Sequence, residues 1–190
     1  MARGFLITGT GARVGKTTVG CALGFAMRAR GLRVGVMKPV DTLESEDAQA
    51  LALAVGSILP MDLICPYRNS SAAPDLSHIS RCFNEIAAQN DAVLVESTEL
   101  LDFADLAAML DLEVLVVVGN RSGCVDATMV TLNRCASRAI KVAGYILCDC
   151  DRTTAVDDES LQQIVKAGYL GRMRHREPLA RAIVEKLILG

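Results

Sequence analysis

The chain has 190 residues, of which 51% are hydrophobic and only 4% are aromatic, and its formal net charge is −2 at pH 7. This length suits a single domain over residues 1–190, with a core of mainly aliphatic side chains. The near-neutral charge excludes the basic footprint of nucleic-acid binding and the basic runs that bind membranes, so we expect neither partner.

Short apolar runs alternate with helical patterns along the chain. The runs predict strands at Gly4–Thr8, Arg33–Met37, Ala92–Glu96, Val114–Val118, Val142–Leu147 and Gly168–Gly171. The helical patterns predict helices at Lys16–Arg30, Asp47–Val55, Ile79–Gln89, Phe103–Leu110, Val125–Arg138, Asp158–Ala167 and Pro178–Leu189. Because the two kinds of element alternate, we expect an α/β fold whose mostly parallel sheet is flanked by helices, with a site at the carboxyl ends of the strands.

Two stretches add detail to this outline. The run Val114–Val118 is apolar on both faces, which indicates a central strand. Residues 57–80 are the richest in Pro, Ser and Asn, so we expect a long loop there that overhangs the site or a subunit interface.

The first predicted strand runs into the glycine-rich segment GTGARVGKTT at residues 9–18, which opens a helix. Backbone N–H groups of such a turn converge on phosphate oxygens, and the helix N-terminus adds about +0.5 charge. Lys16 would reach the terminal phosphates, and the Thr17 hydroxyl would hold Mg²⁺. Five residues separate Gly9 from Gly15, one more than in the common motif, which indicates a particular branch of the P-loop NTPases. The expected nucleotide-binding residues here are Gly11, Ala12, Arg13, Val14, Gly15, Lys16, Thr17 and Thr18.

Charged side chains follow the next predicted strands. Glu96 closes one strand and Asp47 stands near the start of a helix, and their oxygens are the ligands that Mg²⁺ prefers. A solvated strand end for Glu96 and a helix cap for Asp47 remain as alternatives. Lys38 ends the second strand and would enter the cleft beside Lys16, where two ammonium groups stabilise phosphoryl transfer. An exposed strand-end lysine is the other interpretation of Lys38.

The seven cysteines are scattered without the spacing of metal ligands, and only Cys148 and Cys150 lie close in sequence. We therefore expect reduced, mostly buried thiols in a cytoplasmic protein, with a redox or metal role as the alternative. The first residues show no signal-peptide pattern, and no apolar run reaches the ~18 residues that a membrane span needs.

Several of these segments together resemble those of dethiobiotin synthetase. They are GTGARVGKT at 9–17, MKPV at 37–40, an Asp before an Ala-rich helix at 47, VE at 95–96 and VVVGNRSGCVDA at 116–127. The resemblance extends over most of the chain and implies an ATP- and Mg²⁺-dependent ligase of biotin biosynthesis. Members of that family convert 7,8-diaminopelargonic acid and CO₂ into a cyclic urea through a carbamate and a carbamic-phosphoric anhydride.

The resemblance also implies roles for individual residues. Lys16 and Lys38 would be the catalytic pair that binds phosphate and carbamate. Thr17, Asp47 and Glu96 would surround the metal, and Asp149 would contact the nucleotide base. Members of the family are homodimers in which the partner completes the substrate site. The substrate residues implied for this chain are Thr42, Gly123, Cys124 and Asp126.

The sequence departs from the family pattern at four places. Ala12-Arg13 replaces Thr-Glu in the P-loop, and Ser97-Thr98-Glu99 follows Glu96 where the family has a glycine-rich segment. Asp126 replaces Asn at a helix start, and Cys148-Asp149 replaces the Asn-Asp pair that reads adenine. We therefore expect the family's fold with a reshaped pocket, because glycines let the backbone approach a ligand closely.

These departures keep two other functions open. One is a P-loop ATPase that acts as a nucleotide-switched regulator or maturation factor, and the other is a degenerate member that binds nucleotide poorly. Arg13 is either an extra phosphate contact or a solvent-facing loop residue. The basic cluster Arg172, Arg174, His175 and Arg176 is either a solvated loop or a contact to the nucleotide.

Overall fold

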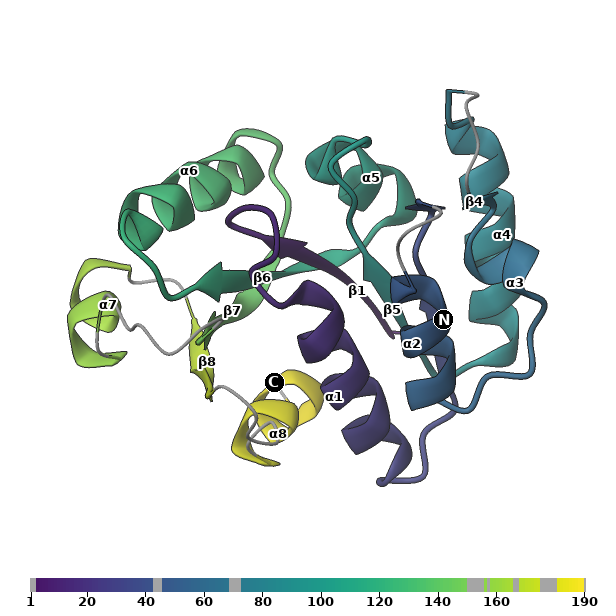
Figure 1. Cartoon of the computed structure of the whole chain (residues 1–190), viewed down its shortest axis with the longest axis horizontal. Helices are drawn as coiled ribbons and strands as arrows, with labels where there is room; N and C mark the ends of the chain where they lie inside the picture. Colours follow the sequence, from purple (N-terminus) through teal and green to yellow (C-terminus); the bar gives the residue numbers. More distant parts are fainter. Residues whose placement is uncertain are drawn as a thin grey trace.

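The computed structural model describes residues 3–42, 46–68, 73–149, 156, 158–165, 168–174 and 181–189 (Figure 1). Its strands are β1 (Arg3–Gly9), β2 (Val34–Met37), β3 (Val40–Asp41), β4 (Tyr67–Arg68), β5 (Ala92–Glu96), β6 (Glu113–Gly119), β7 (Val142–Cys148) and β8 (Tyr169–Met173). Its helices are α1 (Lys16–Arg28), α2 (Asp47–Ala54), α3 (Met61–Ile64), α4 (Leu76–Gln89), α5 (Phe103–Leu110), α6 (Cys124–Ser137), α7 (Asp158–Ile164) and α8 (Arg181–Leu189).

Six strands form the main sheet in the order β2-β5-β1-β6-β7-β8, and every neighbouring pair is parallel. The expected parallel α/β fold is therefore confirmed. Strand β6 lies between β1 and β7, and residues 114–118 are fully buried. The double-faced apolar run thus marks an interior strand, as predicted.

Two helical layers cover the sheet, one on each face (Figure 1). Alternate residues along each strand point to opposite faces, so Phe5 and Ile7 of β1 join one core cluster while Leu6 joins the other. The first cluster includes residues of α1, α2 and α8, and the second includes residues of α4, α5, α6 and α7. This layering leaves the carboxyl ends of the central strands for the loops that carry the site.

The stretch 57–80, expected to be a loop, contains regular structure, so that expectation was wrong for its described residues. Helix α3 lies within it, β4 pairs with β3 in a small parallel sheet, and α4 begins at Leu76 rather than at Ile79. The earlier start follows from Asp75, whose carboxylate caps the helix by accepting the Ser77 N–H at 2.8 Å. Two-residue strands and a four-residue helix are too short to show periodicity in a sequence.

The other helices match the predicted ones closely, although two predicted ends, Ala167 and Pro178, lie outside the described residues. Five of the six described free cysteines are buried and Cys21 is partly buried, so the expectation of mostly buried thiols is confirmed for them. Among the described helices, none has both the length and the apolarity needed to cross a bilayer.

Candidate nucleotide-binding site

The loop between β1 and α1 is fixed at both ends by its neighbours. The Thr10 N–H donates to the Val117 carbonyl at 3.0 Å, and Val14 is only 2% exposed. The Val14 methyl groups occupy the space that a Cβ on Gly9 or Gly119 would need, at 2.5 and 2.7 Å. Gly15, at φ 95°, precedes the first residue of α1. A glycine-rich turn that joins a strand end to a helix N-terminus in this way presents backbone N–H groups to an anion.

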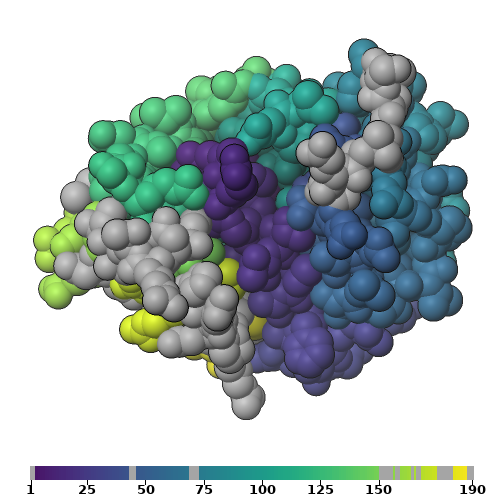
Figure 2. Space-filling view, in the orientation of Figure 1, coloured from purple at the N-terminus to yellow at the C-terminus, as the bar shows by residue number. Residues whose placement is uncertain are grey.

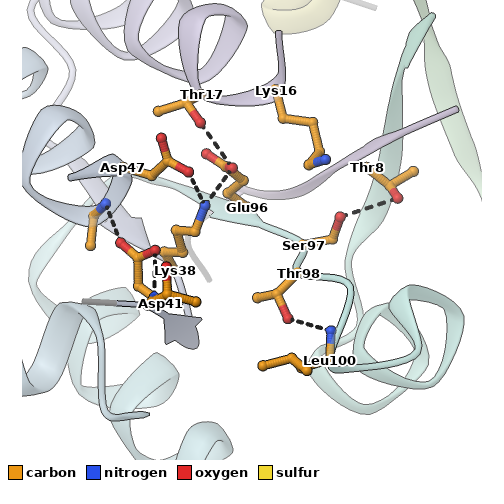
Figure 3. Close-up of polar contacts among 12 residues, drawn as sticks. Thr8, Lys16, Thr17, Lys38, Asp41, Asp47, Glu96, Ser97, Thr98 and Leu100 are labelled. Atoms are coloured by element: carbon orange, nitrogen blue, oxygen red, sulfur yellow. Dashed lines mark hydrogen bonds and ion pairs between the residues drawn. The ribbon is translucent and has the colours of Figure 1, made fainter. Parts of the chain in front are cut away.

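Two side chains of α1 carry the polar groups expected of a phosphate site. The Lys16 ammonium donates to the Gly11 carbonyl at 3.3 Å, so its side chain folds back over the loop. The Thr17 hydroxyl donates to Glu96 Oε1 at 3.0 Å, which joins the start of α1 to the end of β5 (Figure 3). The loop and the strand end thus form one polar cluster.

Lys38 lies between the two predicted metal-binding carboxylates (Figure 3). Its Nζ donates to Asp47 Oδ2 at 2.5 Å and to Glu96 Oε1 at 2.8 Å. The Lys38 side chain is 8% exposed, that of Glu96 is 1% exposed and that of Asp47 is 39% exposed. Lys38 and Glu96 are therefore buried charges that depend on one another, and neither is a solvated strand end.

Burial and charge act in opposite directions on the pKa values of this pair. Burial raises the pKa of Glu96 above its ordinary value, and the nearby Lys38 ammonium offsets only part of that rise. Burial lowers the pKa of Lys38, but the attraction of Glu96 and the hydrogen bond to Asp47 outweigh it, so this pKa lies above its ordinary value. The ammonium form of Lys38 is the form that holds the two carboxylates together.

The residues at this site fit a magnesium ion that is shared with a nucleotide. Glu96 Oε2 is buried and has no hydrogen-bond partner among the described residues, so one oxygen remains for a ligand. No group of three His, Cys, Asp or Glu side chains that could hold a metal occurs in the described part of the chain. Mg²⁺ suits such a sparse site, because it commonly keeps its waters and binds through one or two carboxylates and substrate phosphates.

Asp41 performs the capping role that was an alternative for Asp47. It is 6% exposed, and its carboxylate accepts the Ala48 N–H at 3.1 Å and the Thr42 N–H at 3.0 Å. Asp47 lies in the first turn of the same helix and directs its carboxylate to Lys38 instead. Asp41 was not predicted from the sequence, because it lies six residues before α2 and only the fold brings its carboxylate to the helix N-terminus.

These residues border a cavity of about 960 Å³. Its lining consists of Ala12, Arg13, Val14, Gly15, Lys16, Thr17, Thr18, Lys38, Val40, Asp41, Thr42, Asp47, Glu96, Ser97, Thr98, Glu99, Leu100, Cys148, Asp149, Met173 and Arg174. In the space-filling view, the purple P-loop segment lies between the blue α2 region and the green α6 region (Figure 2). The structure thus brings together nearly all of the predicted nucleotide, metal and catalytic residues, and Gly11 joins them through Lys16.

Three predicted substrate residues lie apart from this cavity. Gly123, at φ 77°, caps α6, Cys124 is buried and Asp126 is exposed in the first turn of that helix. Thr42 is the one predicted substrate residue that lines the cavity of its own chain.

Among the described residues, two side chains hold the carboxylate of Asp149, which also lines the cavity. Arg172 donates to both of its carboxylate oxygens, at 2.9 and 2.8 Å, and the Asn120 side-chain amide donates to Oδ1 at 2.9 Å. The Arg172 side chain is 15% exposed and belongs to β8, so the solvated-loop interpretation is wrong for this residue. Arg174 lines the cavity, while His175 and Arg176 lie outside the described residues.

A family model described as an AAA domain matches residues 3–182. A curated ATP-dependent dethiobiotin synthetase of Anaeromyxobacter dehalogenans is 37% identical and covers 94% of this chain and 88% of its own length. The chain belongs to the dethiobiotin synthetase family. A second such synthetase, from Janthinobacterium sp. (strain Marseille), is 30% identical over 74% of this chain and 73% of its own length. The resemblance inferred from the motifs is therefore confirmed.

Solved structures with the same fold are more distant in sequence. A MinD from Aquifex aeolicus in complex with MinC has a TM-score of 0.69 at 18% identity and covers 97% of this chain and 86% of that one. The septum site-determining protein MinD of Pyrococcus horikoshii, solved with Mg-ADP, has a TM-score of 0.66 at 19% identity, with 98% and 86% covered. At this level of identity the likeness shows only that the fold is that of P-loop NTPases.

Proposed function

We propose that this single P-loop domain closes 7,8-diaminopelargonic acid and CO₂ into the cyclic urea of dethiobiotin, using ATP and Mg²⁺. The observation that carries the proposal is the cluster of Lys16, Thr17, Lys38, Asp47 and Glu96 beside the glycine-rich loop, in a chain related to ATP-dependent ligases. The cytoplasmic location remains a prediction of the sequence.

The reaction has three steps whose bonds can be followed. One amine attacks CO₂ and loses a proton, which gives a carbamate. A carbamate oxygen then attacks the γ-phosphorus of ATP, and ADP leaves. The second amine attacks the carbamate carbon and loses a proton to solvent, the bond from that carbon to the phosphate oxygen breaks, and inorganic phosphate leaves as the ring closes.

This chain's residues would support those steps by charge and position. The loop amides and Lys16 would bind the phosphates, and the Lys38 ammonium would offset negative charge as the phosphoryl group moves. Thr17, Asp47 and Glu96 would hold Mg²⁺, which when bound supplies positive charge beside the phosphate oxygens. The buried Glu96 Oε2, without a partner among the described residues, is the oxygen best placed for that role.

We further propose that the protein acts as a homodimer. Gly123, Cys124 and Asp126 lie away from the cavity of their own chain, as expected if they serve the site of a second copy. The same helix, α6, exposes Met129 by 39% and Val130 by 69%, which offers apolar surface to a partner.

A labelled-bicarbonate assay tests the reaction. Purified protein with ATP, Mg²⁺ and the diamine should incorporate label into a cyclic urea, and Lys16→Ala should abolish the incorporation. Lys141→Ala is the matched control, because Lys141 is an exposed lysine paired with Glu113 at the amino ends of β6 and β7. ATP binding without any turnover at millimolar diamine would contradict the ligase and favour a nucleotide-switched ATPase.

Mixing two inactive variants tests the shared site. In a symmetric dimer, a chain with Lys16→Ala lacks its own nucleotide site but can still complete the site of its partner. A chain with the bulky Asp126→Trp keeps its own nucleotide site but cannot complete the site of its partner. Mixed dimers keep one intact site, so a one-to-one mixture that exchanges subunits should regain about a quarter of wild-type activity. A mixture as inactive as its components, with exchange verified by mass spectrometry, would contradict the shared site.

A further inference from the structure

Three consecutive residues at the carboxyl end of β6, Gly119 to Arg121, contact three separate parts of the nucleotide site. The Gly119 N–H donates to Thr10 Oγ1 at 3.2 Å, and the Asn120 amide donates to Asp149. The Arg121 guanidinium donates from Nη2 to the backbone carbonyl of Arg13 at 3.0 Å. The last contact joins residues 108 positions apart in the chain and reaches the middle of the P-loop.

The residue held by Arg121 has an unusual backbone conformation. Arg13 has φ 52°, in the left-handed region that disfavours any residue with a Cβ. Asp111 and Ala139 share this φ, but both stand at the ends of helices, where a left-handed residue is common. No helix ends at Arg13, so another interaction must stabilise its conformation.

The contact also orients the peptide that follows. In a trans peptide the C=O and the N–H point to opposite sides. Because Arg121 holds the Arg13 carbonyl, the N–H of Val14 in the same peptide is directed to the other side. Buried Val14 then fixes the position of this peptide between the ends of β1 and β6.

We propose that Arg121 is a positioning residue for the P-loop. Its guanidinium keeps Arg13 in the left-handed conformation and thereby preforms the loop amides that receive the nucleotide phosphates. The proposal rests on the proposed function only in assuming that this loop binds ATP. Preformed donors raise affinity because they are already ordered in the free protein, so binding loses no conformational entropy in ordering them.

Calorimetry with ATP and Mg²⁺ tests this role on five variants: Arg121→Gln, Arg13→Ala, Arg13→Gly and the two double variants. Arg121→Gln should weaken ATP binding by roughly threefold to tenfold, the range of a typical net hydrogen bond, because this contact is exposed to solvent. Adding Arg121→Gln to Arg13→Ala should weaken ATP binding by the same factor relative to Arg13→Ala alone. Alanine, like arginine, has a Cβ that disfavours positive φ, so residue 13 would still need the contact from Arg121. The loss of affinity should shrink below about twofold when Arg121→Gln is added to Arg13→Gly, since glycine adopts positive φ freely. Both Arg13→Ala and Arg13→Gly lack the arginine side chain, so a difference between them reports the effect of the backbone conformation at position 13 on ATP binding.

Two further variants exclude a general structural effect. Arg81→Gln on the exposed face of α4, where Arg81 contacts His78, should bind ATP as the wild type does. Arg121→Lys can still donate to the carbonyl and should retain most of the affinity, so it serves if Arg121→Gln folds poorly.

Three results would overturn the proposal. They are wild-type affinity in Arg121→Gln, an equal loss in the Arg13→Ala and Arg13→Gly backgrounds, and no recovery in a folded Arg121→Lys. A wild-type protein that binds no ATP would instead overturn the proposed function together with this role. Diamine turnover is not needed for any of these measurements, so failure of the ligase reaction alone leaves the test intact.

Discussion

Replacing Lys38 by Met should destabilise the protein more than any exposed lysine change. Methionine has a similar length but no charge, so Glu96 and Asp47 would lose their shared ammonium. Removing one partner from a buried ion pair typically costs about 3–5 kcal/mol. Because the Asp47 side chain is 39% exposed and water can reach it, we expect about 2–4 kcal/mol here.

Thermal unfolding measures this loss directly. In a chain of this size, 1 kcal/mol shifts the midpoint by about 2–4 °C, so Lys38→Met should unfold roughly 5–15 °C below the wild type at neutral pH. Lys141→Met is the control, since the Lys141 side chain is 73% exposed and its ion pair is worth about 0–1 kcal/mol. Adding Glu96→Gln to Lys38→Met removes the uncompensated charge and should recover part of the loss.

Lys38→Met should also lower the catalytic rate, and this effect can be measured separately from its effect on stability. At a temperature where Lys38→Met remains folded, ATP should still bind while incorporation of bicarbonate falls by at least about a hundredfold, the range for a lost charge stabiliser. An unfolding midpoint equal to that of Lys141→Met, with no effect of the added Glu96→Gln, would refute the account of Lys38 as the ion that holds the two carboxylates.

Three other substitutions test separate parts of the structure. Asp41→Ala removes the carboxylate that caps α2 and should lower the free energy of unfolding by about 1–2 kcal/mol in urea titrations, whereas an unchanged midpoint would contradict the cap. Gly15→Ala places a Cβ 2.7 Å from Cys148 Sγ at φ 95°, so ATP binding measured by calorimetry should fall, and adding Cys148→Ala should restore only the steric part. Asp91 has its pKa lowered to about 2 by Arg33, so its carboxylate adds stability above its unfolded pKa near 3.8 and loses that contribution as the pH falls toward 2. The difference in unfolding midpoint between wild type and Asp91→Asn should therefore be constant above about pH 5 and shrink between about pH 4 and pH 2.

The alternation of elements could be predicted because each long strand and helix has its own periodicity. Strand β5 was predicted to the residue, and β6 was recognised as interior from its two apolar faces. The segment from β3 to β4 could not be predicted in this way. Its strands have two residues each, and their pairing depends on contacts between Val40 and Tyr67 that local sequence does not encode.

In the site too, the residues themselves could be predicted from the sequence, whereas some of their contacts could not. The positions of Lys16, Thr17 and Glu96 follow from a motif and a strand end, so the sequence sufficed to bring them together. The distribution of roles between two aspartates did not follow, because Asp41 and Asp47 are equally plausible caps until the direction of each side chain is known. The contact between Arg121 and Arg13 was also missed, since it depends on β6 lying beside β1 in the sheet.

The position of Val14 between two glycines links three sites that are far apart in the sequence. Its methyl groups fill the space beside Gly9 and Gly119, at the carboxyl ends of two neighbouring strands. A larger residue at either glycine would need a smaller residue at position 14, so these positions should change together during evolution.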